Sequence, residues 1–71
     1  MSREKEIFER FAIEIAQEII KKEENPDYEI ILDRKSVIGK LSSIMGQEYP
    51  ETASQFDKRI NDHLKRLRRN L

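Results

Sequence analysis

Residues 7–20, with the sequence IFERFAIEIAQEII, decide the fold class of this protein. At about 100° per residue, the apolar side chains of this stretch lie together on one broad face of a helix. The pattern predicts an amphipathic helix over residues 3–24. The helix must end before Asn25 and Pro26, because proline disfavours helical geometry in the residue that precedes it.

The apolar face of this first helix is unusually wide. It spans roughly 240°, whereas packing against one neighbour needs only about 100°. The helix therefore contacts two layers, and the second layer is either another protomer or the other two helices of the same chain wrapped around it. A chain of 71 residues without cysteine has a small core and no disulfide to strengthen it, which favours association. We predict a homodimer whose interface uses apolar side chains of this helix, namely Phe8, Ile13, Ile15, Ile19 and Ile20.

The next part of the chain contains one short extended segment, residues 28–32. Tyr28, Ile30 and Leu32 alternate there with Glu29 and Ile31, which is the pattern of a strand. A lone strand leaves backbone groups without partners. The segment therefore pairs with a partner chain, pairs with another extended piece, or serves as an extended linker whose apolar residues plug the core.

A second helix is predicted over residues 34–45. Asp33 or Ser36 can cap its start, and Gly46 suits its end because glycine adopts the left-handed conformation without strain. Gly39 lies inside this helix, where glycine costs about 1 kcal/mol relative to alanine. We interpret Gly39 as the site of a close packing contact.

A third helix is predicted over residues 51–69. Pro50 suits its first turn, and Thr52 with Gln55 matches a capping box. Its apolar residues form a narrow stripe: Phe56, Ile60, Leu64, Leu67 and Leu71. Together the three segments predict an all-α, or nearly all-α, fold. We expect a three-helix, helix-turn-helix-like bundle in a single domain of residues 1–71.

The charge is unevenly distributed although the net charge is zero. Residues 1–33 carry five basic and ten acidic side chains, a net charge of −5, whereas residues 34–71 carry nine basic and four acidic ones, a net charge of +5. This asymmetry indicates a basic end that binds a partner. It is explained equally by attraction between the two halves of the chain, or between two chains paired head to tail.

The composition argues against catalysis, a metal centre and a cofactor. There is no cysteine and a single histidine, His63, which falls at the edge of an apolar stripe and is interpreted as a boundary residue. Glu14 and Glu18 are spaced as metal ligands can be, but we assign them to a solvated helix face. Three short helices also leave little room for a substrate cavity of a few hundred Å³. We therefore expect no enzymatic activity, no catalytic residue, no metal and no cofactor.

The chain is expected to act in the cytoplasm and away from membranes. No segment approaches the roughly 18 continuous apolar residues that a membrane span requires. The first seven residues are of mixed charge and are not followed by an apolar run, so they do not resemble a signal peptide.

The third predicted helix carries the strongest functional signal. Short polar side chains at its start can reach base edges, and the basic side chains beyond them can neutralise phosphates. We assign base contacts to Thr52, Ser54, Gln55 and Arg59, and phosphate contacts to Lys58, Lys65, Arg66 and Arg69, with Lys35 and Lys40 as further candidates. The competing interpretation is that these charges only complement the helix dipole and form pairs along the helix.

The order helix, short strand, helix, turn, helix resembles the first part of winged-helix DNA-binding domains. Residues 62–71, DHLKRLRRNL, look like the end of their recognition helix, and Leu41 and Gly46 occupy positions where a helix-turn-helix has an apolar residue and a glycine. The resemblance implies a small DNA-binding regulatory protein that acts as a dimer. The helix from Thr52 onward would then lie in the major groove.

Two further interpretations stay open. A ribbon-helix-helix arrangement fits the order from Tyr28 onward, but the strand faces are acidic or apolar and suit DNA less well. Alternatively, the protein is an interaction adaptor or small inhibitor whose basic half docks on an acidic protein partner, with no nucleic acid involved.

Overall fold

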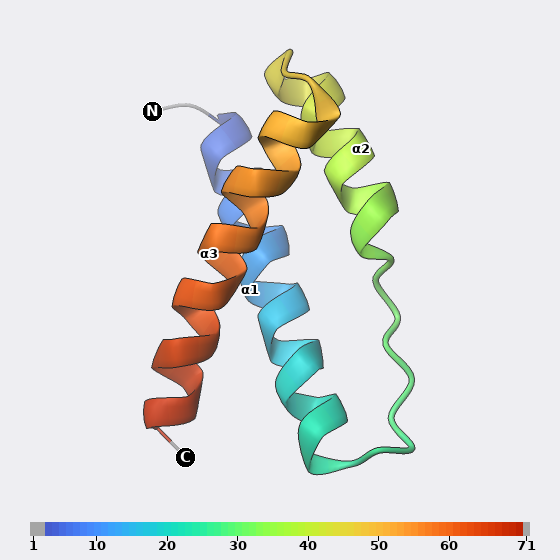
Figure 1. The fold of residues 1–71 in the computed structure, drawn as a ribbon, viewed down its shortest axis with the longest axis vertical. Helices are drawn as coiled ribbons and strands as arrows, with labels where there is room; N and C mark the ends of the chain where they lie inside the picture. The colour runs from blue at the N-terminus through green and yellow to red at the C-terminus, as the bar shows by residue number, and fades with distance from the viewer. Residues whose placement is uncertain (1–2, 71) are drawn as a thin grey trace.

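The computed structural model describes residues 3–70 and contains three helices. They are α1 (Arg3–Glu24), α2 (Arg34–Met45) and α3 (Tyr49–Arg69). In Figure 1, α1 and α3 run downwards across one another, and the shorter α2 runs upwards beside them. No strand occurs within residues 3–70, so the prediction of an all-α fold is confirmed.

The ends of α1 and α2 lie where the sequence predicts them. α1 stops at Glu24, directly before Asn25 and Pro26. α2 follows Asp33, whose carboxylate accepts a hydrogen bond from the Ser36 hydroxyl at 2.8 Å. α2 ends at Gly46, which has φ 64° and ψ 35°. Gly46 thus adopts the left-handed conformation that glycine tolerates best.

The start of α3 differs from the prediction. The helix begins at Tyr49, two residues earlier than expected, so Pro50 falls in its first turn and Glu48 is the capping residue. The predicted capping box is therefore wrong. Thr52 instead lies inside the helix, where its hydroxyl donates a hydrogen bond to the backbone carbonyl of Glu48 at 3.2 Å and lies 3.1 Å from the side-chain oxygen of Gln47. The connection between α2 and α3 shortens to residues 46–48.

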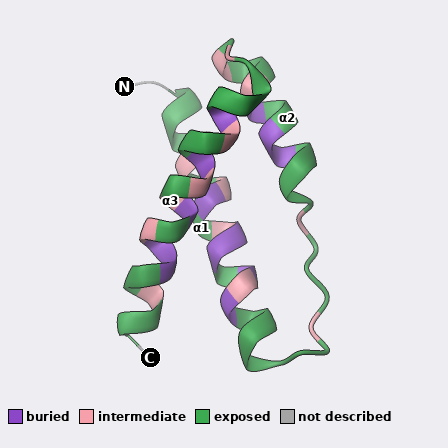
Figure 2. Ribbon diagram, viewed as in Figure 1, coloured by how far each residue is buried: buried purple, intermediate pink, exposed green. Residues whose placement is uncertain are grey.

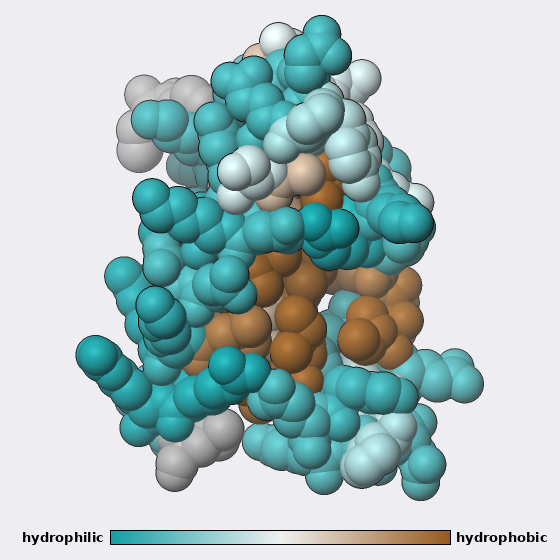
Figure 3. All heavy atoms as spheres, viewed as in Figure 1, coloured by the Kyte–Doolittle hydropathy of each residue, from teal (hydrophilic) through white to brown (hydrophobic). Residues whose placement is uncertain are grey.

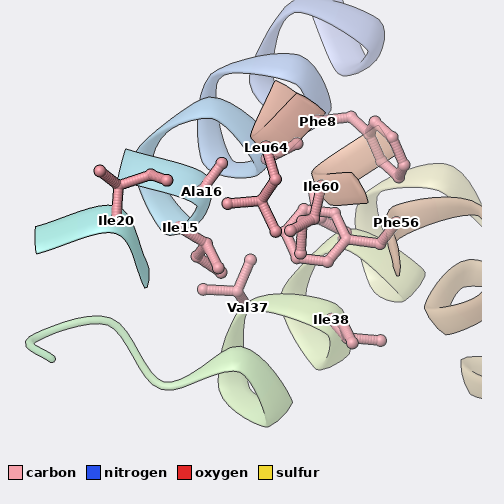
Figure 4. Close-up of a cluster of buried hydrophobic side chains, with 11 residues drawn as sticks. Phe8, Ile15, Ala16, Ile20, Val37, Ile38, Phe56, Ile60 and Leu64 are labelled. Carbon is pink, nitrogen blue, oxygen red and sulfur yellow. The ribbon is translucent and has the colours of Figure 1, made fainter. Parts of the chain in front are cut away.

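All three helices contribute to a small apolar core (Figure 4). Within it the rings of Phe8 and Phe56 meet edge to face, with centroids 5.4 Å apart and planes inclined by 82°. Such pairs stabilise a core by about 0.5–1.5 kcal/mol beyond the area they bury. The core residues are Phe8, Ala12, Ile15, Ala16, Ile20, Val37, Ile38, Leu41, Phe56, Ile60 and Leu64. Leu67 packs partly against them, and the last predicted member of the α3 stripe, Leu71, lies outside the described residues.

The wide apolar face of α1 is explained largely within one chain. α3 packs along one side of α1, and α2 with the segment before it packs on the other (Figures 1 and 2). Phe8, Ile15 and Ile20 are at most 8% exposed, so they fill the monomer's own core and are not free for a second protomer. Of the five residues assigned to a dimer interface, only Ile13 is exposed, and Ile19 is partly buried.

Gly39 does not mark a close packing contact, so that interpretation is wrong. The residue is exposed, and a Cβ atom built on it would meet nothing within 4 Å. Glycine at this position therefore weakens α2 without improving its packing.

The segment between α1 and α2 is extended but forms no strand. Leu32 packs partly against the core, as expected for a linker that plugs it, whereas Ile30 and Ile31 are exposed. Lys22, in the last turn of α1, donates hydrogen bonds to the carbonyl oxygens of Pro26 and Tyr28 at 2.6 and 2.9 Å. Figure 3 shows apolar atoms reaching the surface in a hollow between the lower part of α3 and this segment. The three helices thus do not cover all of their apolar surface on this face.

Candidate nucleic-acid interface

Three arginines are engaged in ion pairs that join different helices or segments. Arg34 contacts both carboxylate oxygens of Asp57, and Arg68 contacts Glu23. Arg59 contacts both carboxylate oxygens of Glu9 on α1. These arginines are parts of the fold, because each one ties α3 to an earlier part of the chain.

The Glu9–Arg59 pair is the centre of a small polar cluster between α1 and α3. His63, only 8% exposed, places its Nε2 atom 3.0 Å from Glu9, and Arg59 also contacts Asp62 at 3.2 Å. The Arg59 guanidinium, together with His63, holds the pKa of the Glu9 carboxyl below its ordinary value despite partial burial. The same pairing raises the pKa of Arg59, so both groups stay charged.

Part of the charge asymmetry therefore serves to hold the helices together. The Glu9–Arg59 and Glu23–Arg68 pairs connect the acidic and the basic half of the chain, as expected if the two halves attract each other. Bidentate arginine–carboxylate contacts are the stronger kind of ion pair. These two pairs account for Arg59 and Arg68, but not for the other basic side chains of α3.

Four basic side chains of α3 remain outside this network. Lys58, Lys65, Arg66 and Arg69 are exposed, and within residues 3–70 none of them forms an ion pair or a side-chain hydrogen bond. Lys58, Lys65 and Arg69 are spaced seven and four residues apart, which places them on one face of the helix. Arg66 flanks this face. We call these four residues the α3 basic face.

Short polar side chains continue the same face towards the start of α3. Ser54 and Gln55 are exposed, as the assignment to base contacts requires. Lys35 and Lys40, the further candidates for phosphate contacts, are exposed on α2. Most of the assigned residues are therefore accessible, and their contacts with bases and phosphates stay a prediction.

Two of the residues assigned to base contacts, Thr52 and Arg59, are engaged in contacts within the protein. Thr52 is fully buried, and its hydroxyl is occupied by the turn before α3, so the expectation that it is exposed is wrong. Arg59 is held by Glu9 and Asp62, and a base contact would require those ion pairs to break. Sequence periodicity could not reveal this, because the partner of Arg59 lies fifty positions away.

The prediction that Glu18 lies on a solvated helix face is wrong. Glu18 is 7% exposed, not on a solvated face. Its carboxylate accepts hydrogen bonds from the backbone N–H groups of Ile31 and Leu32 at 2.8 and 3.1 Å, and from the Tyr28 hydroxyl at 3.2 Å. Burial raises the pKa of Glu18, but these hydrogen bonds outweigh burial and lower it overall. The sequence does contain one indication of this burial. On the predicted helix, Glu18 falls within the apolar arc, close to the position of Phe11.

The described residues show neither a metal-binding cluster nor a membrane-spanning helix. Within residues 3–70, no three histidine, aspartate or glutamate side chains are grouped so that they could hold a metal ion. None of the helices in that range combines the length and the apolar character needed to cross a membrane. Comparison of the chain with protein-family models, with curated proteins and with solved structures gives no match.

Proposed function

We propose that the protein binds DNA through the α3 basic face. Lys58, Lys65, Arg66 and Arg69 would contact phosphates, and Ser54 and Gln55 would approach base edges. Contacts between lysine or arginine and phosphate release counterions, and this supplies much of the affinity of DNA-binding proteins.

The observation that carries this proposal is the state of Asp57 and Asp62, two of the three acidic side chains on α3, the third being Glu51 in the first turn. Asp57 and Asp62 interrupt the basic sequence, and from sequence alone they would weaken its field. In the structure, however, Asp57 is neutralised by Arg34, and Asp62 contacts Arg59. Among the described residues 3–70, the four cations of the α3 basic face have no such partners. Their positive potential is therefore available to an external anion.

The connection between α2 and α3 also favours this proposal. Because α3 begins at Tyr49, the turn comprises only residues 46–48 and starts with Gly46 in the left-handed conformation. A turn of three or four residues, often with glycine, is typical of the helix-turn-helix motif. In that motif the second helix lies in the major groove with its N-terminal residues at the bases, which would use Ser54 and Gln55.

The test is a salt titration of binding to a fluorescein-labelled duplex of mixed sequence, followed by anisotropy. We expect binding at tens of micromolar protein in about 50 mM salt, weakening by about 0.9 log units per log salt for each phosphate contact. Lys65→Gln should reduce the slope by about that amount. Arg10→Gln removes the same charge from the outer surface of α1 and should leave the slope unchanged. Absence of binding under these conditions, or equal effects of the two variants, would contradict the proposal.

A second candidate function rests on the same four cations. They would equally suit an acidic protein partner, for which the protein would act as an adaptor or inhibitor. Competition with poly-L-glutamate distinguishes the two functions. If the polypeptide displaces the duplex at an equal concentration of charge, the α3 basic face recognises anionic charge alone and the acidic partner is favoured. If the duplex stays bound to the protein, DNA binding is favoured.

A further inference from the structure

A groove separates the start of α1 from the first half of α3, at the end of the bundle where α2 terminates. Its volume is about 550 Å³, within the range of roughly 300–1,000 Å³ that is typical of small-molecule sites. Its lining is provided by all three helices: Lys5, Phe8 and Glu9 from α1, Met45 from α2, and Gln55, Lys58, Arg59 and Asp62 from α3. Lys65, Arg66 and Arg69 do not line it, whereas Lys58 belongs both to the groove and to the α3 basic face.

The floor of the groove is apolar. Phe8 lies there, supported from behind by its edge-to-face contact with Phe56, and Met45 is only partly buried beside it. A second hollow of about 230 Å³ shares Lys5 and Met45 with the groove and continues towards the exposed side chain of Ile44. The apolar surface is therefore elongated, with the adaptable methionine side chain in its middle.

The rim of the groove carries three basic side chains (Lys5, Lys58 and Arg59) and two acidic ones (Glu9 and Asp62), a net charge of +1. Glu9 and Asp62 are both in contact with Arg59, which lies between them. Lys58 is exposed, and no ion pair of the described residues includes it. An anionic group in the groove would therefore meet the ammonium group of Lys58, while the two carboxylates that could repel it share the positive charge of one guanidinium.

We propose that this groove binds a small anionic amphiphile, a molecule with an elongated apolar body and one acidic group. The apolar body would lie over Phe8 and Met45, and the acidic group would pair with Lys58. This arrangement follows the usual division of labour in ligand sites, where apolar contacts provide most of the affinity and a few polar groups fix the orientation. The two proposals share Lys58, but the apolar floor of Phe8 and Met45 takes no part in the proposed contact with phosphates, so the inference stands without DNA binding.

The test uses two fluorescent probes of similar shape. Anilinonaphthalene sulfonate carries the acidic group, and N-phenylnaphthylamine lacks it. We expect Lys58→Gln to raise the Kd for the sulfonate by about three- to fivefold, as one exposed charge contact allows. The Kd for the neutral probe should stay unchanged. Lys65→Gln is the matched control, because it removes the same charge from the same helix outside the groove, and it should alter neither Kd.

Met45→Glu should weaken both probes, since it places a carboxylate on the apolar floor. Circular dichroism checks that each variant keeps its helices. If Met45→Glu lowers the helix content, the comparison of Lys58→Gln with Lys65→Gln still tests the proposal. The proposal is overturned if the sulfonate does not bind, if both lysine variants weaken it equally, or if Lys58→Gln weakens the two probes alike. DNA binding serves as an independent readout, because Lys65→Gln should weaken the duplex and leave the sulfonate unaffected.

Discussion

The backbone N–H of Ile31 donates a hydrogen bond to the carboxylate of Glu18 at 2.8 Å, across thirteen positions of the chain. The neighbouring N–H of Leu32 donates to the second oxygen of the same carboxylate. An extended segment without a strand partner thus obtains its hydrogen bonds from a side chain of α1. This contact fixes the direction from which the chain enters α2.

Replacement of Glu18 by glutamine should destabilise the protein. The amide retains one acceptor oxygen, but its NH2 group would face a backbone N–H that also donates. We expect the free energy of unfolding to fall by about 1–3 kcal/mol, the usual cost of an unsatisfied buried polar group. Urea unfolding measures the change. Glu14→Gln, one helical turn away and more exposed, should stay within about 0.5 kcal/mol of the parent. Equal effects of the two variants would refute this role of Glu18.

The protein should lose stability in acid because the pKa values of Glu9 and Glu18 are lowered in the folded state. A carboxyl group with a lowered pKa stabilises the fold above its ordinary value of 4.5 and loses that contribution as the pH falls through the folded-state pKa. Urea midpoints measured from about pH 7 to about pH 3 should therefore decline below the ordinary glutamate range. The decline should be smaller in Glu18→Gln, and an unchanged decline would contradict the assignment.

The two glycines should respond to alanine in opposite directions. Gly39 is exposed in the middle of α2 with open space around it, so Gly39→Ala should raise stability by about 1 kcal/mol. Gly46 also has open space, but its φ of 64° strains any residue with a Cβ atom. Gly46→Ala should lower stability by about 1–2 kcal/mol. Thermal unfolding of the two variants side by side tests this, and a gain in stability for both would be incompatible with the structure.

Thr52 should matter for folding and not for DNA binding. Thr52→Val keeps the buried shape but removes the hydroxyl contacts with Gln47 and Glu48, so stability should fall by about 0.5–1.5 kcal/mol. The affinity for duplex DNA, measured by anisotropy under folding conditions, should not change. Ser54→Ala should behave in the opposite way, with unchanged stability and weaker binding. A loss of DNA affinity in Thr52→Val at full helix content would restore its assignment to base contacts.

Dimerisation through α1 stays a prediction, now restricted to the side chains that the monomer leaves accessible. Ile13→Glu should convert a dimer to a monomer in sedimentation experiments without loss of helix content, since Ile13 is 37% exposed. Ile31→Glu, at the most exposed isoleucine, tests the extended segment as the alternative interface. If Ile31→Glu dissociates the dimer and Ile13→Glu does not, the interface lies on the extended segment and not on α1. If the parent protein is itself a monomer, the prediction of a dimer is wrong.

Much of the architecture could be predicted from local signals. The 3.6-residue periodicity of α1, the proline after it and the glycine after α2 each act within a few residues, so the bounds of α1 and α2 were predicted correctly. The start of α3 was missed by two residues because the pairing of Thr52 with Gln55 imitates a capping box. The helix instead uses Glu48, and Thr52 turns back into the core.

The candidate interface was predictable only in part. The sequence identifies α3 as the basic helix and places Lys58, Lys65 and Arg69 on one face, because that spacing is a property of the helix alone. It cannot separate these side chains from Arg59 and Arg68, which look the same in composition but are paired with Glu9 and Glu23.

Three helices, their apolar faces and the uneven distribution of charge follow from the amino-acid sequence alone, because helix formation and amphipathicity depend on neighbours within one or two turns. The packing of the helices determines which of the described charged side chains form ion pairs between helices, and whether the wide apolar face of α1 is covered by its own chain. Those outcomes depend on residues that are distant in sequence. An ion pair such as Glu9–Arg59 or a hydrogen bond such as Ile31–Glu18 exists only after the helices have packed.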